Sequence, residues 1–169
     1  MPLVIVGVMG PGDGATARDR EDAYQLGRAI AQEGWSLVTG GRNEGVMDSA
    51  SRGAKEAGGL TIGVLPSSDK DGVSRFVDVA IVTGMGEARN NINVLSSDVV
   101  FACGMGAGTA SEVALAVKAR RHVILLNVSD QAARFFVELD PNRIHVATDA
   151  KNAVDTARQL LNTFASRNP

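Results

Sequence analysis

The chain has 169 residues, enough for one domain (1–169) that withdraws roughly 70% of its unfolded surface from water. Lys and Arg number 17 against 19 Asp and Glu, which excludes the strong positive field that draws proteins to nucleic acid or anionic membranes. The single Cys103 excludes an intrachain disulfide, and no apolar run approaches the ~20 residues of a membrane span. Without a signal-peptide pattern, these features predict a cytoplasmic protein that binds neither nucleic acid nor membrane.

Short runs rich in Val, Ile and Leu alternate with segments of helical periodicity along almost the whole chain. The runs are too short for helices and unbroken enough to be strands buried on both faces. We predict strands at Leu3–Val8, Trp35–Val38, Leu60–Leu65, Val77–Val82, Val99–Ala102, Val123–Leu126 and Ile144–Ala147. We predict helices at Asp19–Glu33, Val46–Ala57, Asn90–Ser96, Ala110–Arg120 and Ala150–Phe164. The polar segment Pro66–Arg75 is expected to form the rim of a pocket or a lid over it, and the tail 165–169 to be frayed.

This alternation predicts an α/β fold with a doubly wound, mostly parallel sheet and helices on both faces. In such folds ligands bind beyond the carboxyl ends of the strands. Glycine allows close approach of the backbone to a ligand, and helix N-termini attract anions. Any one glycine-rich turn also has an ordinary structural explanation, but four together predict a single ligand pocket. The four loops are GVMGPGDGATA, TGGRNEGVM, TGMGEARNN and CGMGAGTASE.

Two nucleotide-binding motifs can be tested directly on the sequence. Gly10, Gly12 and Ala15 fit the G-x-G-x-x-G/A dinucleotide fingerprint, but the second strand runs into TGGR (39–42) instead of an acidic residue that would hold a ribose hydroxyl. The G-x-x-x-x-G-K-[ST] motif is absent, and no lysine has a convincing setting for a pyridoxal Schiff base. We therefore expect neither NAD nor pyridoxal phosphate as a cofactor.

The sequence does not suggest a metal site. His122 and His145 are far apart in sequence, and each adjoins or lies within a predicted strand, so both are expected to be structural. Cys103 closes a buried strand and is expected to be a small core residue. Its place directly before the fourth glycine loop leaves a second interpretation open, in which it lines the pocket.

Thr109 and Glu112 allow two interpretations. A threonine followed three residues later by glutamate at a helix start is a capping box, in which case Glu112 only caps its helix. Alternatively, a phosphate on the amides of Gly106–Thr109 lies beside a carboxylate. That arrangement requires a ligand that also presents hydroxyl or N–H donors, such as a phosphorylated sugar or pterin.

Arg89 also has two interpretations. It lies near a predicted helix start, where the helix dipole disfavours a cation, so it is either a solvated surface residue or a group that grips phosphate at the pocket rim. The neighbouring Asn90, Asn91 and Asn93 offer uncharged donors and acceptors, which suit recognition more than proton transfer.

These motifs resemble the lysine-decarboxylase-like, or Lonely Guy, family. GMGAGTASE is similar to its PGGxGTxxE signature, Arg89 to its upstream arginine, and TGGRNEGVMDSASRGAKEAGGLTIGVLP to its second-strand glycine motif, helix and strand. The resemblance covers about residues 3–127 and implies a Rossmann-like fold, homo-oligomers and ligands that bear a phosphate. In the family's enzymes, which release a base from a nucleoside 5′-monophosphate, the residues matching Arg89 and Glu112 serve catalysis.

The chain departs from the enzymes at three places. Gly104-Met105-Gly106 replaces Pro-Gly-Gly, Asn90 replaces the lysine after the arginine, and Ser111 replaces the first acid of a Glu-Glu pair. With these changes the sequence more closely resembles the family's molybdenum cofactor carrier branch. That resemblance implies a chain that binds molybdenum cofactor (molybdopterin), with its phosphate on the glycine loop, and protects or delivers it without catalytic residues. The alternative is a phosphoribohydrolase that uses Arg89 and Glu112.

Under the carrier interpretation, loop amides and a hydroxyl hold the phosphate, glycines of the first two loops let the ligand approach, and Arg89 and the asparagines orient it. The predicted ligand-binding residues are Gly10, Gly12, Gly40, Gly41, Arg89, Asn90, Gly104, Met105, Gly106, Ala107, Gly108, Thr109 and Glu112. The apolar surface of Val113, Leu115, Ala116 and Val117 exceeds what one sheet face needs, which predicts a homo-oligomer, either a dimer or a tetramer.

Overall fold

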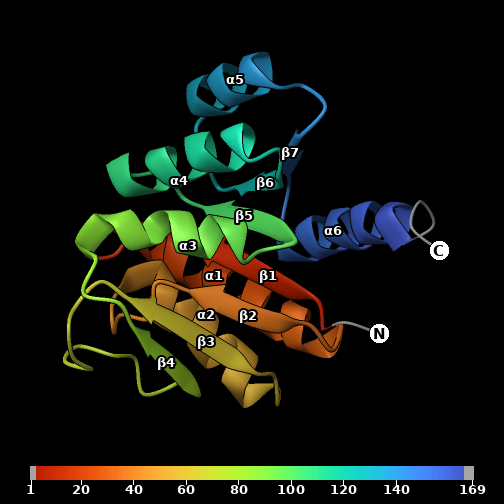
Figure 1. Ribbon diagram of the computed structural model, residues 1–169. Coiled ribbons are helices and arrows are strands. Elements are labelled where there is room, and N and C mark those ends of the chain that lie inside the picture. Colours follow the sequence, from red (N-terminus) through yellow and green to blue (C-terminus); the bar gives the residue numbers. More distant parts are fainter. Residues whose placement is uncertain (1–2, 166–169) are drawn as a thin grey trace.

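Seven strands form one sheet in the order β4-β3-β2-β1-β5-β6-β7, and every adjacent pair is parallel (Figure 1). The computed structural model describes residues 3–165, so residues 166–169 of the tail expected to be frayed lie outside the described part. The strands are β1 (Ile5–Met9), β2 (Ser36–Thr39), β3 (Thr61–Leu65), β4 (Val79–Val82), β5 (Val99–Cys103), β6 (His122–Leu126) and β7 (Ile144–Ala147).

Helices cover both faces of this sheet, which confirms the predicted doubly wound α/β fold. Helices α1, α2 and α6 pack on one face, and α3, α4 and α5 pack on the other (Figure 1). None of the helices described is long and apolar enough to cross a membrane. The helices are α1 (Ala17–Gln32), α2 (Gly45–Glu56), α3 (Asn90–Leu95), α4 (Ala107–Lys118), α5 (Asp130–Leu139) and α6 (Ala150–Ala165), with a short 3₁₀ helix η1 (Gly86–Arg89) before α3.

Strand β5 explains why its sequence is an unbroken apolar run. Its side chains alternate between the two faces. Val99, Phe101 and Cys103 enter the core under α1, α2 and α6, while Val100 and Ala102 enter the core under α3, α4 and α5. All five are fully buried. Burying the larger of these side chains stabilises the fold by about 2 kcal/mol each, because their apolar surface leaves water.

The expectation that every predicted strand is buried on both faces is wrong for the two edge strands: Val146 of β7 is 56% exposed, and β4 is exposed along most of its length. Val79, Ile81 and Val82 are 47%, 44% and 39% exposed. The reason is position: β4 is the last strand at one edge of the sheet and pairs only with β3. An apolar run therefore predicts a strand correctly here but not its burial.

Two helices differ from the sequence prediction. Helix α5 was not predicted, although Ser129 accepts a hydrogen bond from the Ala132 amide as an N-cap and starts the helix. Helix α4 begins at Ala107, three residues before the predicted Ala110. The second difference matters more, because it moves the first turn of α4 into the glycine loop.

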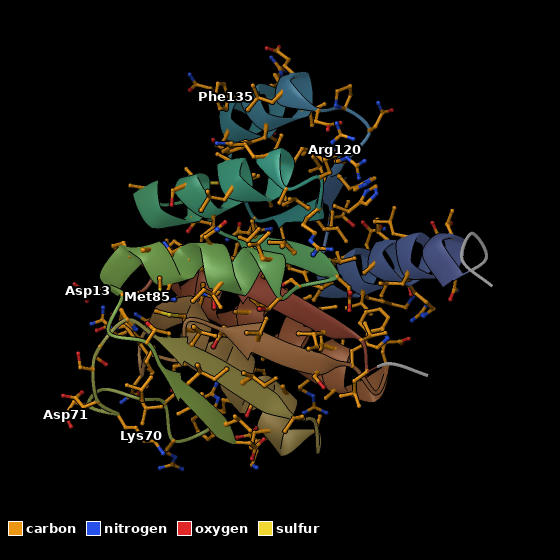
Figure 2. All side chains as sticks on the ribbon, viewed as in Figure 1. Asp13, Lys70, Asp71, Met85, Arg120 and Phe135 are labelled. Carbon is orange, nitrogen blue, oxygen red and sulfur yellow. The ribbon has the colours of Figure 1, made fainter. Side chains whose placement is uncertain are left out.

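The sequence argument for oligomerisation is also corrected by the fold. Val113 and Ala116 on α4 are fully buried against the chain's own sheet, and Leu115 and Val117 are half-buried beside them. They are therefore not surplus apolar surface. The exposed large apolar residues on the described helices of this layer are instead Phe135 and Leu139 on α5, at 57% and 53%, and Leu95 on α3, at 49%. Figure 2 shows Phe135 on α5, the outermost helix of that layer.

Candidate ligand-binding pocket

The four glycine loops meet in one pocket of about 370 Å³ at the carboxyl ends of the strands. In the sheet, β2 and β5 flank β1 on opposite sides, so the pocket lies at the topological switch point, as expected. Figure 2 shows Asp13, one of the lining residues, at the end of the sheet opposite Arg120. The lining residues are Val8, Met9, Gly10, Pro11, Gly12, Asp13, Gly14, Gly40, Arg42, Glu44, Met47, Glu87, Arg89, Asn90, Gly106, Ala107, Gly108, Thr109 and Glu112.

The N-terminus of α4 opens into this pocket without a cap. Its N-cap residue is Gly106, which has no side chain to cap with, so the amides of Ala107, Gly108 and Thr109 face the pocket without an intrahelical partner. A Cβ built on Gly108 meets no atom within 4 Å, so the space in front of the turn is open. Three amides and the positive end of the helix dipole therefore converge on empty volume.

The capping-box interpretation of Thr109 and Glu112 is wrong. Because α4 begins at Ala107, Thr109 is the third helical residue and Glu112 lies in the second turn. The Thr109 hydroxyl is buried and has no hydrogen-bond partner among residues 3–165. Buried hydroxyl groups are usually partnered, so this one is an unsatisfied polar group in the pocket wall.

The N-terminus of α1, after the first glycine loop, is closed. Thr16 accepts the Asp19 amide at 3.1 Å, and the Asp19 carboxylate accepts the Thr16 amide at 2.9 Å, which is a complete capping box. The other carboxylate oxygen of Asp19 accepts the Asn127 amide at 2.7 Å. The first loop therefore contributes its backbone at Gly10, Gly12 and their neighbours as pocket wall, while the start of α1 is satisfied internally.

Arg89 is buried in the pocket wall without a counter-ion. Its residue is 6% exposed, its Nε has no hydrogen-bond partner, and no carboxylate of the described chain lies within ion-pair distance. Burial lowers its pKa, while the charges of Glu112 and Glu87 act to raise it. Because the pKa of arginine is so high, the guanidinium stays charged. The interpretation of Arg89 as a solvated surface residue is therefore wrong.

Gly40 makes room for Arg89. A Cβ at position 40 would collide with Nη1 of Arg89 and with the sulfur of Met47. Any side chain here would push the guanidinium out of its place. Gly40 lines the pocket as predicted, but the group it most directly accommodates is a side chain of the protein itself.

Glu112 is the second buried ionisable group of the pocket. It is 7% exposed, and burial raises its pKa to about 7, while the charge of Arg89 and the Asn93 side chain act to lower it. Asn93 is fully buried, and both of its amide atoms lack a hydrogen-bond partner of normal geometry. At neutral pH the Glu112 carboxyl is therefore held close to an even balance between its acid and its carboxylate forms.

Three of the predicted ligand-binding residues do not line the pocket. Gly41 has a φ of +75°, and its missing Cβ gives Gly63 of β3 room to approach. Gly104 has a φ of +74° and lies against the Asp19 carboxylate, and Met105 packs on the core under α4. Asn90 does line the pocket, where its amide donates to Glu87 at 3.4 Å.

Sequence reasoning missed several lining residues, among which Arg42, Glu44 and Met47 come from the segment after β2. Arg42 and Glu44 form an ion pair at 2.7 Å. The loop between β3 and β4, predicted as a rim or lid, does not line the pocket but is fastened to this segment. Asn43 donates its amide to Gly72, and Ser74 donates its amide to Gly41, both at 2.8 Å. The TGGRNEG motif contained the signal, since charged residues in a loop at the carboxyl edge are candidates for a rim.

The remaining candidates lie outside the pocket. Cys103 is fully buried, its pKa is raised by burial, and its thiol donates to the Asp19 carbonyl at 3.5 Å, so it is a core residue. Nδ1 of His122 and Nε2 of His145 are 3.0 Å apart on neighbouring strands. No group of three potential metal ligands is found among the residues described.

A second hollow, of about 650 Å³, lies between α1 and α6 and is larger than the glycine-loop pocket. Its walls are helix side chains, including the Arg158–Glu33 ion pair at 2.6 Å. No glycine loop contributes to it, and the start of α6, whose Ala150 and Lys151 line it, carries the Asp149 carboxylate as a cap that accepts the Asn152 amide at 2.8 Å. Four of its ionic groups, Glu33, Lys151, Asp155 and Arg158, already pair with one another, so size alone does not make it the better candidate.

Comparison with known proteins identifies the family of the chain and several similar structures. Residues 3–154 match the family described as the SLOG cluster4 family. A molybdenum cofactor binding protein from the phototrophic bacterium Rippkaea orientalis is 56% identical, with a TM-score of 0.93 over 95% of this chain and 99% of that one. The Moco carrier protein from Chlamydomonas reinhardtii is 52% identical, with a TM-score of 0.91 over 96% of this chain and 99% of that one.

A more distant similarity links the chain to enzymes. A cytokinin riboside 5′-monophosphate phosphoribohydrolase from Mycobacterium tuberculosis is 34% identical over 95 residues. The match spans 55% of this chain and only 51% of the enzyme. The similarity to the two cofactor-binding proteins is thus both higher and more complete.

Proposed function

The chain belongs to the SLOG cluster4 family, and from the geometry of its pocket we propose that it binds molybdenum cofactor and protects or delivers it without catalysis. One observation carries this proposal: the uncapped N-terminus of α4 and the unpaired Arg89 share one pocket. The similarity to two molybdenum cofactor proteins over nearly their whole length supports the choice of ligand.

The pocket suits a phosphorylated heterocycle on physical grounds. A dianionic phosphate at the start of α4 would accept the amides of Ala107, Gly108 and Thr109 and the Thr109 hydroxyl. Arg89 would then lie in the same pocket as a counter-charge with few competing partners. A volume of about 370 Å³ is within the range of small-ligand pockets, and the first glycine loop offers its backbone at Gly10 and Gly12 as a wall for a flat ring.

The direct test is saturable binding of molybdenum cofactor to the purified protein. Gly108→Asp should weaken binding at least 100-fold, roughly the effect of a like charge a few ångströms from the phosphate. Gly108→Asn is the matched control for size, because both side chains enter space that is open in the structure. Equal affinity of Gly108→Asp and the unmodified protein, or no saturable binding at all, would contradict the proposal.

A second candidate, a nucleoside 5′-monophosphate phosphoribohydrolase, is favoured by one observation. Glu112 is buried in the pocket with a pKa near 7, and Arg89 lies in the same wall, which suits a general acid and a charge stabiliser. Incubation with nucleoside monophosphates should release free base that is lost in Glu112→Gln. If no base is released while molybdenum cofactor binds, the carrier function is supported and the enzyme is excluded.

We also propose that the chain is a single 1–169 domain that forms a cytoplasmic homo-oligomer, either a dimer or a tetramer. Exposed apolar side chains support self-association, namely Phe135 and Leu139 on α5 and Val79 and Ile81 on β4. Sedimentation equilibrium of the purified protein distinguishes the states. Phe135→Ser and Ile81→Ser, tested separately, indicate which surface is used, and a monomer at all concentrations would contradict self-association.

A further inference from the structure

Glu112 lies on the same face of α4 as the open amides. Gly108 and Glu112 are four residues apart, so their positions are one turn apart on one side of the helix. Both line the pocket, as does Thr109 between them. A ligand anion seated at the start of α4 therefore has the Glu112 carboxyl as a neighbour.

An ionised Glu112 would oppose that anion. Two like charges a few ångströms apart in a partly buried site repel each other by several kcal/mol. A neutral carboxylic acid at the same place offers an O–H donor, which forms a short, strong hydrogen bond to an anionic oxygen. The two forms of one side chain thus have opposite effects on binding.

The charged groups around Glu112 do not fix its protonation state, because they largely offset or pair with one another. The 3₁₀ helix η1 contributes Arg89 and Glu87, whose charges partly offset each other. From the loop after β2 come Arg42 and Glu44, which pair with each other, and the loop after β1 contributes Asp13. None of these groups forms an ion pair with Glu112 within the described chain.

Resting on the function proposed above, we propose that Glu112 binds the anionic group of the ligand as the neutral acid, donating a hydrogen bond to it. Binding then takes up a proton at this carboxyl. Loss of that proton as the pH rises weakens binding. Glu112 is thereby a ligand-binding residue whose charge state sets the affinity for the anion.

The unusual environment of the carboxyl supports this role. Burial holds the pKa of Glu112 at about 7 even before an anion is present, and a nearby negative charge raises a carboxyl pKa further. Glu112 therefore needs little free energy to be protonated at neutral pH. An exposed glutamate would need more, since its ordinary pKa lies near 4.5.

Sulfate is a suitable probe because it stays dianionic throughout the useful pH range, whereas phosphate itself titrates near neutrality. Isothermal titration of the full-length protein with sulfate should show affinity falling about 30-fold between pH 5.5 and pH 8.5, as one proton is lost from a group of pKa near 7. Glu112→Gln retains an N–H donor and carries no charge. Its sulfate affinity should be nearly independent of pH and close to that of the unmodified protein at pH 5.5.

A second measurement needs no variant in the pocket. Titrations at pH 7.5 in two buffers of different ionisation enthalpy should reveal net proton uptake on sulfate binding to the unmodified protein. Glu138→Gln removes an exposed carboxylate of α5 and serves as the control, which should keep both the pH dependence and the proton uptake.

The outcomes separate this inference from the proposed function. If Gly108→Asp abolishes sulfate binding but the unmodified protein binds sulfate equally at all pH values, the anion site stands and the role of Glu112 is wrong. The role is also wrong if Glu112→Gln keeps the full pH dependence. If sulfate binds and Gly108→Asp does not weaken it, the anion site at α4 and this inference fall together.

Discussion

The N-termini of α1 and α4 follow similar glycine-rich loops at the same edge of the sheet, yet they differ in what they can bind. At α1 the N-cap is Thr16 and the third helical residue is Asp19, and the two satisfy each other's amides. At α4 the corresponding residues are Gly106 and Thr109, and neither satisfies the helix start. Glycines thus make a loop approachable, but the absence of a cap makes a helix start available to a ligand.

The largest expected effect comes from removing the cap of the closed end. Asp19→Ala leaves the Thr16 amide and the half-buried Asn127 side chain without their acceptor. We expect a loss of about 4 kcal/mol in the free energy of unfolding, from two lost charge-assisted hydrogen bonds. Urea unfolding measures it. A loss below about 1 kcal/mol would mean that the capping box is not what closes α1.

At the open end, Glu112→Gln should raise the free energy of unfolding at alkaline pH, whereas Asp19→Ala lowers it. The folded protein holds the Glu112 proton up to about pH 7, whereas the unfolded chain loses it near pH 4.5. Stability therefore falls as the pH rises between these values, and the ionised carboxyl costs about 3 kcal/mol above pH 7. Glu112→Gln should be more stable than the unmodified protein at pH 8, with little difference at pH 4.

Urea unfolding at both pH values measures this difference. Comparing the variant with the unmodified protein at each pH cancels the carboxylates that titrate in the other direction, such as Glu33, whose pKa is lowered mainly by hydrogen bonding to Arg158. A gap between the two proteins that does not change with pH would contradict the raised pKa of Glu112.

Thr109→Val and Thr16→Ala form a matched pair at the two ends. The hydroxyl of Thr109 is buried without a partner, so replacing it by a methyl group should stabilise the protein by about 1 kcal/mol. The same change should weaken sulfate binding about tenfold through a lost hydrogen bond. Thr16→Ala should instead destabilise by about 1 kcal/mol and leave sulfate affinity unchanged. Thermal unfolding and sulfate titration of both variants measure these effects. Weaker sulfate binding in Thr16→Ala, together with unchanged binding in Thr109→Val, would contradict the assignment of the open end to α4.

The smallest expected effect on stability comes from Gly106→Ser, which introduces a capping side chain at the uncapped start of α4. Gly106 has an extended conformation, and a Cβ built there meets only Pro11 at 3.7 Å, so serine fits. Gly106→Ser should raise stability by a few tenths of a kcal/mol, because the new hydroxyl caps α4. Sulfate affinity should fall about tenfold, since the hydroxyl occupies an amide that the anion needs. Unchanged affinity would show that the ligand does not use these amides.

Sequence patterns were sufficient for the sheet because its central strands are buried on both faces and read as unbroken apolar runs. They failed to predict burial where it depends on which elements pack beside a strand in space, as at the edge strand β4. They also placed the start of α4 three residues late. Gly106 and Gly108 read as loop residues, although both are compatible with a helix start that is open to solvent.

The site was predictable to the extent that it depends on glycine. Four loops were assigned to one edge, and they line one pocket. Which group each glycine accommodates was not predictable, because that depends on packing between loops. Gly40 faces Arg89, Gly104 faces Asp19, and Gly41 lies against β3. The uncapped state of α4 was equally hidden, because Thr109 and Glu112 carry the spacing of a cap but lie one turn too far along the helix.

The contact between Gly40 and Arg89 has a practical consequence. Buried arginines usually pair with a carboxylate, whereas this one has no such partner in the described chain and its Nη1 lies beside the backbone of Gly40. Its positive charge is therefore left for an anion that enters the pocket, which Arg89 lines. Buffer ions such as chloride, sulfate or phosphate should collect beside it when the protein is purified empty. Preparations meant for loading should be exchanged into large, weakly binding anions first, because any resident ion must leave before the cargo enters.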